Sequence, residues 1–361
     1  MTLSNIDLRS NAIGFLRLFF ATAVVWSHAY YLGGFGDDPI GRITHGALTA
    51  GLLSVGGFFV LSGFLIARSF ERVDGLGRFL WHRVLRIFPA FWVCLFVVAF
   101  VLAPLLYAGQ HGTVIGFFAQ TESPWGYVLK NALLKLNQLS VAGPFPSLPF
   151  PVGVNGSLWS LEYEFLCYLA VGLFGVAGIL KRKPELALAA WITFLVISAV
   201  LGVFRGMDPT PYGGEVLYLY VFFATGVCAY LFRDRIPMRA PVATLCAVAL
   251  IAGLPTRTYG LLVPICLSYL TLFAAMRLPI RNLDRRADLS YGIYIYAFPL
   301  QQLLAMYHAN RLGVFLYFVA AAILVIPIAA ASWFLIEKPS LSLKNLRGTG
   351  LAAGRASGDM L

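Results

Sequence analysis

The stretch Gly14 to Gly34, GFLRLFFATAVVWSHAYYLGG, is long enough to cross a bilayer as one helix, yet it contains Arg17 and His28. Hydrocarbon disfavours both side chains, so each needs a polar interior, a partner or the membrane surface. The two residues are eleven positions apart, which on an α-helix puts them within about 20° of one face and roughly 16 Å apart along the axis. One helix face therefore joins a cation near one membrane surface to a titratable ring near the other.

Two explanations compete for these residues. In the first, Arg17 extends its side chain to the lipid headgroups and His28 is an interfacial histidine, and neither has a chemical role. In the second, both belong to a site inside a helical bundle. The remainder of the chain favours the second explanation.

The composition excludes a single soluble domain. The 361 residues are 59 % hydrophobic and only 12 % charged, and the mean hydropathy is +0.79. The net charge of +11 does not indicate a nucleic-acid partner, because no basic tract interleaved with aromatic residues stands outside the apolar runs. The five cysteines are widely spaced inside apolar runs, so neither a disulfide framework nor a metal site is predicted.

We predict an all-α integral membrane protein, a bundle of about ten transmembrane helices over residues 1–337, followed by a mobile cytoplasmic tail over 338–361. The connection between residues 107 and 156 is long and proline-rich. An amphipathic helix lying at the membrane interface is predicted within it, from Trp125 to Leu139. The ten predicted spans are 12–33, 47–68, 80–106, 157–180, 186–205, 215–233, 239–256, 259–277, 289–308 and 312–336.

The distribution of basic residues predicts the orientation. With these spans, 20 of the 27 Lys and Arg residues fall on the side of the N-terminus and six on the other side, and Arg17 lies within the first span. Cytoplasmic loops carry the excess of Lys and Arg, so both termini are predicted to be cytoplasmic. His28 and the long loop then face the extracytoplasmic side.

Polar side chains recur in the second and third spans. The second is rich in glycine and carries the hydroxyl of Ser62, a pattern typical of close helix packing. The third opens with Arg83 and Arg86, which are three positions apart and share a face. Two guanidinium groups at the cytoplasmic surface suit a phosphate-rich ligand, although topological anchoring is an equally simple explanation.

The fourth span begins with two carboxylates, Glu162 and Glu164. They point about 200° from each other on a helix, so at most one faces the centre of the bundle. Glu164 shares its face with small and polar side chains, among them Ser160, whereas the neighbours of Glu162 are bulky and apolar. We therefore predict that Glu164 is the functional acid.

Together with further motifs, these residues make the chain resemble acyltransferase family 3, the bacterial integral-membrane acyltransferases that O-acylate cell-surface glycans. The resemblance covers nearly all ten spans, and its motifs occur in the family's order. They are Arg17 with His28; Gly57 to Phe64, which includes Ser62; Arg83 and Arg86 with Pro89; Trp159, Ser160 and Leu161 with Glu164; Ser290 and Tyr291 with Tyr294; and Ile336 to Pro339.

The resemblance implies that His28 is the catalytic histidine, that Arg17, Arg83 and Arg86 hold the acyl donor, usually acetyl-CoA, and that Glu164 is a functional acid. Ser62, Trp159, Ser160 and Tyr291 would support the substrate or the structure, and no metal is implied. The location implied is the bacterial inner membrane. The chain departs from the family pattern at Ala297, where a histidine is common, and at Phe165, where a second acid is common.

A mechanism follows from these expectations. The donor phosphates stay at the cytoplasmic arginines while the pantetheine arm reaches toward His28, which acts as general base on an acceptor hydroxyl of a glycan or lipid-linked saccharide. Glu164 would orient the ring or hold the sugar, and an acyl-histidine intermediate would use the same residues. The rival class is a transporter or flippase, which would use the same ionisable residues as a substrate path. The acceptor, the acyl chain length and association into a homo-oligomer are left open.

Overall fold

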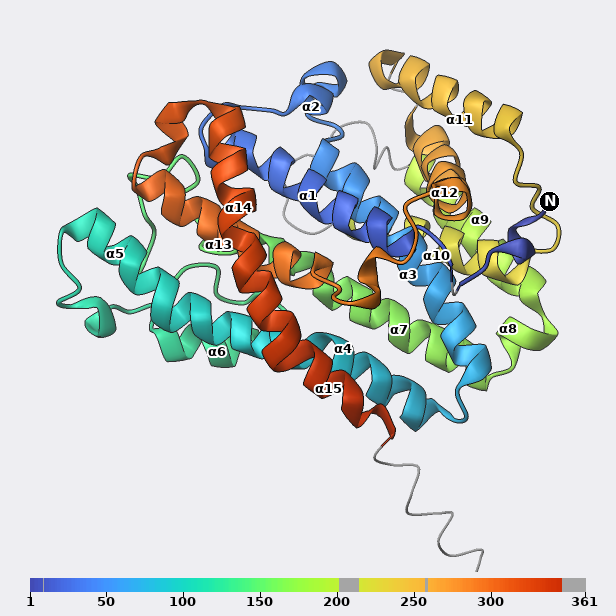
Figure 1. The fold of residues 1–361 in the computed structure, drawn as a ribbon, viewed down its shortest axis with the longest axis horizontal. Helices are drawn as coiled ribbons and strands as arrows, with labels where there is room; N and C mark the ends of the chain where they lie inside the picture. The colour runs from blue at the N-terminus through green and yellow to red at the C-terminus, as the bar shows by residue number, and fades with distance from the viewer. Residues whose placement is uncertain (9, 201–213, 257–258, 346–361) are drawn as a thin grey trace, which may run out of the picture.

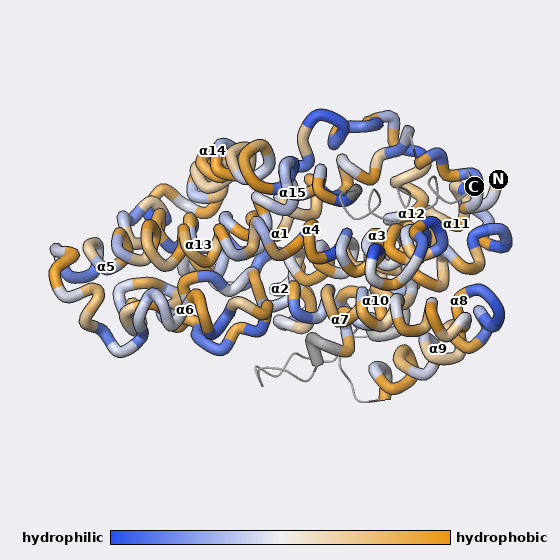
Figure 2. The backbone as a smooth tube through the Cα atoms, turned by 90° about the horizontal axis from the view of Figure 1, so that it is seen from below, coloured by the Kyte–Doolittle hydropathy of each residue, from blue (hydrophilic) through white to orange (hydrophobic). Residues whose placement is uncertain are grey.

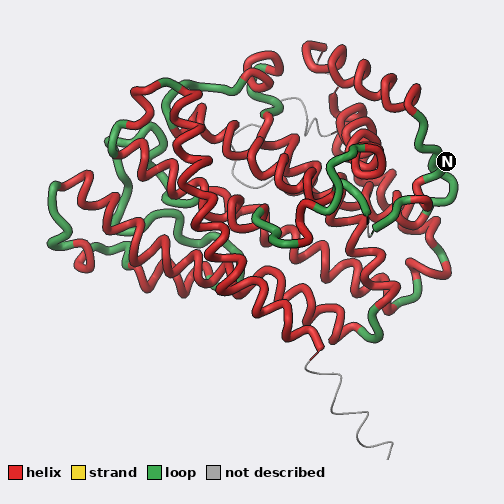
Figure 3. Tube along the Cα trace, in the orientation of Figure 1, coloured by secondary structure: helices red, strands yellow, loops and turns green. Residues whose placement is uncertain are grey.

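The computed structural model describes residues 1–8, 10–200, 214–256 and 259–345. Within these ranges regular structure is helical, apart from an isolated bridge between Thr2 and Pro237. Figure 3 shows the helices joined by loops, with no strand drawn in the described part of the chain. The prediction of an all-α chain is confirmed for these residues.

Each of the ten predicted ranges contains a helix, and Figure 1 shows how these helices pack. A π-helical turn, Val98–Leu102, joins α4 to α5, so that the two form one continuous rod. Residues 201–205, the end of the fifth predicted span, lie outside the described residues. The long helices are α1 (Ile13–Leu32), α3 (Ala50–Arg72), α4 (Leu76–Val97) with α5 (Ala103–His111), α7 (Ser160–Val176), α9 (Pro184–Val200), α10 (Gly214–Leu231), α11 (Ala240–Gly253), α12 (Tyr259–Arg277), α13 (Ser290–Met306) and α14 (Val314–Ser332).

Four helical segments of the described chain are long and apolar enough to cross a membrane: Ile13–Leu32, Ala50–Arg72, Leu76–His111 and Val314–Ser342. Shorter apolar helices coincide with α9, α10, α11 and α12. In Figure 2 the helices are mostly hydrophobic, and hydrophilic residues gather in the connections, among them the loop beside α8 (Ile179–Arg182). The protein is thus a helical membrane protein, and the number of crossings stays a prediction.

Helix α3 lies at the centre of the bundle and packs on α1, α7, α10 and α12. Its closest neighbour is α10. A methyl group on Gly63 would overlap the carbonyl oxygen of Phe223, and one on Gly226 would overlap the carbonyl oxygen of Val60. The two backbones therefore touch, as the glycine-rich sequence of the second span predicts.

The long connection contains part of the helix that is predicted to lie at the membrane interface. The helix there, α6 (Pro124–Asn131), is shorter than the prediction of Trp125 to Leu139, which is wrong beyond residue 131. The cause is the side chain of Asn131, whose Oδ1 accepts hydrogen bonds from the backbone nitrogens of Asn137 and Gln138 at 2.8 and 3.0 Å. These bonds fold the chain back on itself and end the helix.

Helical structure continues past residue 337, the predicted end of the membrane domain. Residues Lys338–Ser342 form α15, and Leu343–Asn345 form a 3₁₀ turn. This segment lies on the start of α4, where Nε1 of Trp81 donates a hydrogen bond to the carbonyl oxygen of Leu343 at 3.2 Å. The remainder of the predicted tail, residues 346–361, lies outside the described residues.

Candidate functional site

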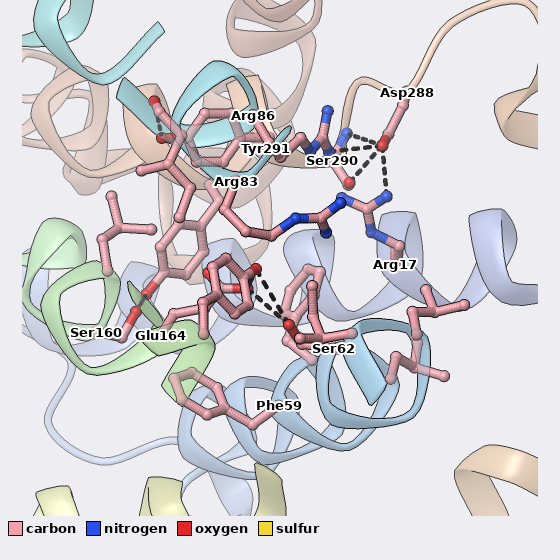
Figure 4. Close-up of a pocket in the computed structure, with 18 of the residues that line it drawn as sticks. Arg17, Phe59, Ser62, Arg83, Arg86, Ser160, Glu164, Asp288, Ser290 and Tyr291 are labelled. Atoms are coloured by element: carbon pink, nitrogen blue, oxygen red, sulfur yellow. Dashed lines mark hydrogen bonds and ion pairs between the residues drawn. The ribbon is translucent and has the colours of Figure 1, made fainter. Parts of the chain in front are cut away.

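A cavity of about 360 Å³ lies between α1, α3, α4, α7, α13 and the C-terminal segment. The five helices contribute one or more polar side chains each, so residues that are far apart in the sequence meet there (Figure 4). Two of the residues predicted for the site, His28 and Trp159, do not line this cavity. Those that do are Arg17, Ser62, Arg83, Arg86, Ser160, Glu164 and Tyr291.

One carboxylate joins two of the arginines. Oδ2 of Asp288 accepts a hydrogen bond from Arg17 at 2.5 Å and another from Arg86 at 2.7 Å. The other side of Arg86 meets Glu337, whose Oε2 lies 3.3 Å from Nη1. Figure 4 shows Arg17 and Arg86 converging on Asp288. Two positive and two negative charges therefore form one network that is neutral overall.

Asp288 is held in place at the start of α13. Its Oδ1 accepts a hydrogen bond from Oγ of Ser290 at 2.6 Å. Burial by itself would raise the pKa of Asp288, but Arg17 and Arg86, with the hydrogen bonds from Ser290, together lower that pKa below its ordinary value. Asp288 thus stays ionised while it is only 10 % exposed.

Deeper in the cavity, Glu164 accepts hydrogen bonds from Ser62 at 2.9 Å and from the hydroxyl of Tyr168 at 2.5 Å. Glu162 does not line the cavity, so the structure places the predicted glutamate inside and the other outside. Within the described chain, no hydrogen bond joins Glu164 to His28. In this structure the glutamate positions two hydroxyl groups on the cavity wall.

The hydroxyl groups of Ser160 and Tyr294 lie 2.6 Å apart and both residues line the cavity. His28 lies beyond them, next to Phe298, which follows Tyr294 by one turn of α13. The imidazole packs edge-on against Tyr31 and Phe298, with ring centroids 5.3 Å apart in each pair. Its Nδ1 is buried and has no hydrogen-bond partner among the described residues.

Two predicted supporting residues have structural contacts. The ring of Trp159 packs against Tyr163, with centroids 6.0 Å apart. The hydroxyl of Tyr291 donates a hydrogen bond to the carbonyl oxygen of Ile87 at 2.9 Å, and the guanidinium of Arg86 lies over its ring. Tyr291 therefore fixes α13 to the turn of α4 that carries the arginines.

Sequence reasoning missed Asp288, His82 and Lys344, all of which line the cavity. A signal was available for Asp288, because an acid directly before a predicted span that contains Ser290 and Tyr291 is an ionisable group at a membrane boundary. No such signal marked Lys344, which stands in a stretch whose composition is typical of a disordered end.

No cluster of three or more metal-ligating side chains occurs in the part of the chain that the structure describes. The five cysteines are buried and form no disulfide. The polar groups of the cavity are instead cations, carboxylates and hydroxyl groups, a set that suits an anionic organic ligand.

Comparison with known proteins identifies relatives along the whole bundle. Residues 10–334 match the model of a family described as an acyltransferase domain. An O-acetyl transferase of Shigella phage Sf6 is 27 % identical over 92 % of this chain and 97 % of its own. Nodulation protein 10 of Rhizobium leguminosarum bv. viciae is 30 % identical over 96 % of each chain, and an acyltransferase of Streptomyces mycarofaciens is 31 % identical over 52 % of this chain and 44 % of its own. No solved structure matches.

Proposed function

Because this chain belongs to the acyltransferase domain family, acyltransferase family 3, and is therefore an enzyme, we propose that it is a membrane-embedded O-acyltransferase. It moves an acyl group, which we propose is acetyl, from cytoplasmic acyl-CoA to a hydroxyl group of an extracytoplasmic glycan or lipid-linked saccharide. The printed name of the phage relative, an O-acetyl transferase, supports acetyl as the group. The membrane would be the bacterial inner membrane, crossed many times. Membership of a transferase family favours this function over a transporter or flippase.

The observation that carries the proposal is the cavity itself. Three arginines line it, and so do Glu164, Ser62 and Tyr168, which are hydrogen-bonded to one another. The cavity therefore offers cations for the phosphates of an acyl-CoA donor and polar groups for its pantetheine arm. A polyanionic donor cannot enter hydrocarbon, so its phosphates stay at the basic end of the cavity while its pantetheine arm extends along α7 and α13.

The proposed chemistry takes place at His28. The imidazole removes the proton of the acceptor hydroxyl as its oxygen attacks the thioester carbonyl carbon. A C–O bond forms, the C–S bond breaks, and the proton passes from the imidazolium to the departing CoA sulfur. The unpartnered Nδ1 of His28 supports this role, because a buried nitrogen without a hydrogen bond is available to a substrate.

The experiment uses the full chain in proteoliposomes. Labelled acetyl-CoA is supplied outside and a saccharide acceptor is enclosed inside, and acylated acceptor is measured by mass spectrometry. We expect acylation of the enclosed acceptor together with release of CoA outside. Movement of the unmodified saccharide across the membrane without acylation would instead establish the transporter function, and acylation only of acceptor outside would contradict transfer across the membrane.

A further inference from the structure

We propose that Arg83, Lys344 and His82 form the phosphate subsite of the cavity, and that Arg17 and Arg86 build the cavity wall instead of binding the phosphates directly. This assignment rests on the proposed function, in which a CoA thioester is the donor. It divides the basic residues of one cavity into two groups that differ in their partners.

The division follows from the ion pairs. Asp288 and Glu337 neutralise Arg17 and Arg86, as their distances of 2.5 to 3.3 Å indicate. Among the described residues, no carboxylate forms an ion pair with Arg83 or Lys344. A ligand that binds Arg17 or Arg86 must displace a carboxylate, whereas a ligand that binds Arg83 or Lys344 breaks no ion pair of the described residues. The binding free energy of an anion is therefore more favourable at Arg83 and Lys344 than at Arg17 and Arg86.

Unpartnered nitrogens gather at the same place. Three of the buried side-chain nitrogens that have no hydrogen-bond partner among the described residues belong to residues that line this cavity: Nε of Arg83, Nε2 of His82 and Nε1 of Trp333. The single side-chain hydrogen bond found for Arg83 is a long one, 3.3 Å from Nη2 to Oγ of Ser69. A phosphate group offers several acceptor oxygens, so it can accept hydrogen bonds from Nε of Arg83 and Nε1 of Trp333 together, and from Nε2 of His82 when that nitrogen carries the proton.

The C-terminal segment holds Lys344 at this subsite. The hydrogen bond from Trp81 to the carbonyl oxygen of Leu343 fixes the backbone next to Lys344 on α4. His82, the residue after Trp81, lines the cavity together with Lys344. Leu341 from the same segment also lines the cavity. The segment beyond the last long helix thus forms one wall of the donor site.

Burial and the charges of Arg83 and Arg86 lower the pKa of Lys344 to about 8. This direction agrees with the geometry, because Lys344 is partly buried near two arginines and forms no ion pair with a described carboxylate. A bound phosphate would supply that anion and would restore the ordinary preference of the lysine for its charged form.

The test measures binding of CoA and of S-acetylpantetheine, which lacks the nucleotide phosphates, to the purified full chain by calorimetry. Lys344→Met should lower the ratio of the two affinities about tenfold, and Lys344→Arg should retain most of that ratio because it keeps the charge. Lys181→Met is the matched control, since Lys181 is an exposed lysine of α8 that does not line the cavity. Circular dichroism melting would establish that each variant is folded.

The outcomes separate this inference from the proposed function. If wild type binds CoA and Lys344→Met binds it equally well, the subsite assignment is overturned while the donor assignment stands. A larger loss of affinity in Arg17→Met than in Arg83→Met would also overturn it, because the paired arginine would then be the phosphate ligand. Absence of CoA binding by wild type would refute the donor assignment, and the phosphate subsite with it.

Discussion

The hydroxyl of Tyr294 lies 2.6 Å from Oγ of Ser160, and this contact joins α13 to the start of α7 on the cavity wall. Phe58 of α3 packs against Tyr294, with ring centroids 6.1 Å apart. Along α13, Tyr294 stands one turn before Phe298, on which His28 packs, so a donor arm that follows α13 from the arginines toward His28 passes Tyr294. Opening of this contact would be a step that precedes acyl transfer.

Tyr294→Phe removes the hydrogen bond and should make this step easier. One hydrogen bond contributes about 1 kcal/mol, so we expect a rate of transfer at saturating acetyl-CoA up to roughly fivefold higher, with a slightly lower melting temperature. Single-turnover transfer and CoA affinity would be measured side by side. A lower rate with unchanged affinity would show that the hydroxyl participates in the chemistry instead of closing the path.

His28→Ala should reduce transfer to less than a few per cent of wild type, because no other base is proposed for the acceptor hydroxyl. CoA affinity should change less than about twofold, since His28 does not line the cavity. His111→Ala serves as the control, because His111 is an exposed histidine at the end of α5. Substantial transfer by the His28 variant would remove this residue from the proposed catalytic role.

Glu164→Gln should lower turnover by at least about a hundredfold, whereas Glu162→Gln should have little effect. Both hydrogen bonds that Glu164 accepts inside the cavity go to its Oε1, so glutamine can keep their geometry but loses the charge that strengthens them. Glu162 does not line the cavity and makes a matched control on the same helix. Equal losses in both variants, at matched expression, would contradict the assignment.

Asp288→Asn should destabilise the bundle by roughly 2–3 kcal/mol, because it leaves Arg17 and Arg86 together without their shared carboxylate. This expected loss of unfolding free energy is smaller than that for breaking a fully buried ion pair, because Arg17 is 23 % exposed. Melting curves would be compared with those of Asp74→Asn, an exposed acid between α3 and α4. The double variant with Arg17→Met should recover part of the loss, and a purely additive double variant would argue against the pairing.

The lowered pKa of Lys344, about 8, predicts a pH dependence of acetyl-CoA binding. Below pH 8 the lysine is charged in both free and bound protein, and affinity should not vary on its account. Above pH 8 the free protein loses the proton while the complex retains it, so affinity should fall by up to about tenfold per pH unit. Lys344→Met should lack this fall. The other titratable or charged groups that line the cavity are Arg17, His82, Arg83, Arg86, Glu164, Tyr168, Asp284, Asp288, Tyr291 and Tyr294.

The lowered pKa of Lys344 also affects the stability of the fold, which should rise with pH where the affinity for acetyl-CoA falls. Between about pH 8 and the ordinary pKa of 10.5, the unfolded chain binds more protons at Lys344 than the folded chain does. The free energy of unfolding of the ligand-free protein should therefore rise with pH over this interval. Urea titrations of wild type and Lys344→Met at pH 7.5 and 9.5 would measure the difference, and a contribution of opposite sign would contradict the lowered pKa.

The positions of the helices could be predicted from the sequence, because apolar length and charge are properties of each segment alone. The spacing of Arg83 and Arg86 likewise placed both on one cavity wall. The contact of Asp288 with Arg17 could not be predicted, since these residues are 271 positions apart and meet only through the packing of α1 against α13. Composition was misleading at Lys344. The sequence around it is typical of a disordered tail, but a hydrogen bond from Trp81 to the carbonyl oxygen of Leu343 holds the backbone of this segment on α4.

The close approach of α3 and α10 at Gly63 and Gly226 has a consequence for biogenesis. Helix α3 leaves the ribosome long before α10 has been translated, and until then its glycine surface has only lipid or an insertion factor to cover it. The central helix pair, and with it the wall of the cavity that Ser62 occupies, can therefore be completed only late in synthesis. The cavity wall is therefore complete only after both helices are in the membrane and have packed on each other.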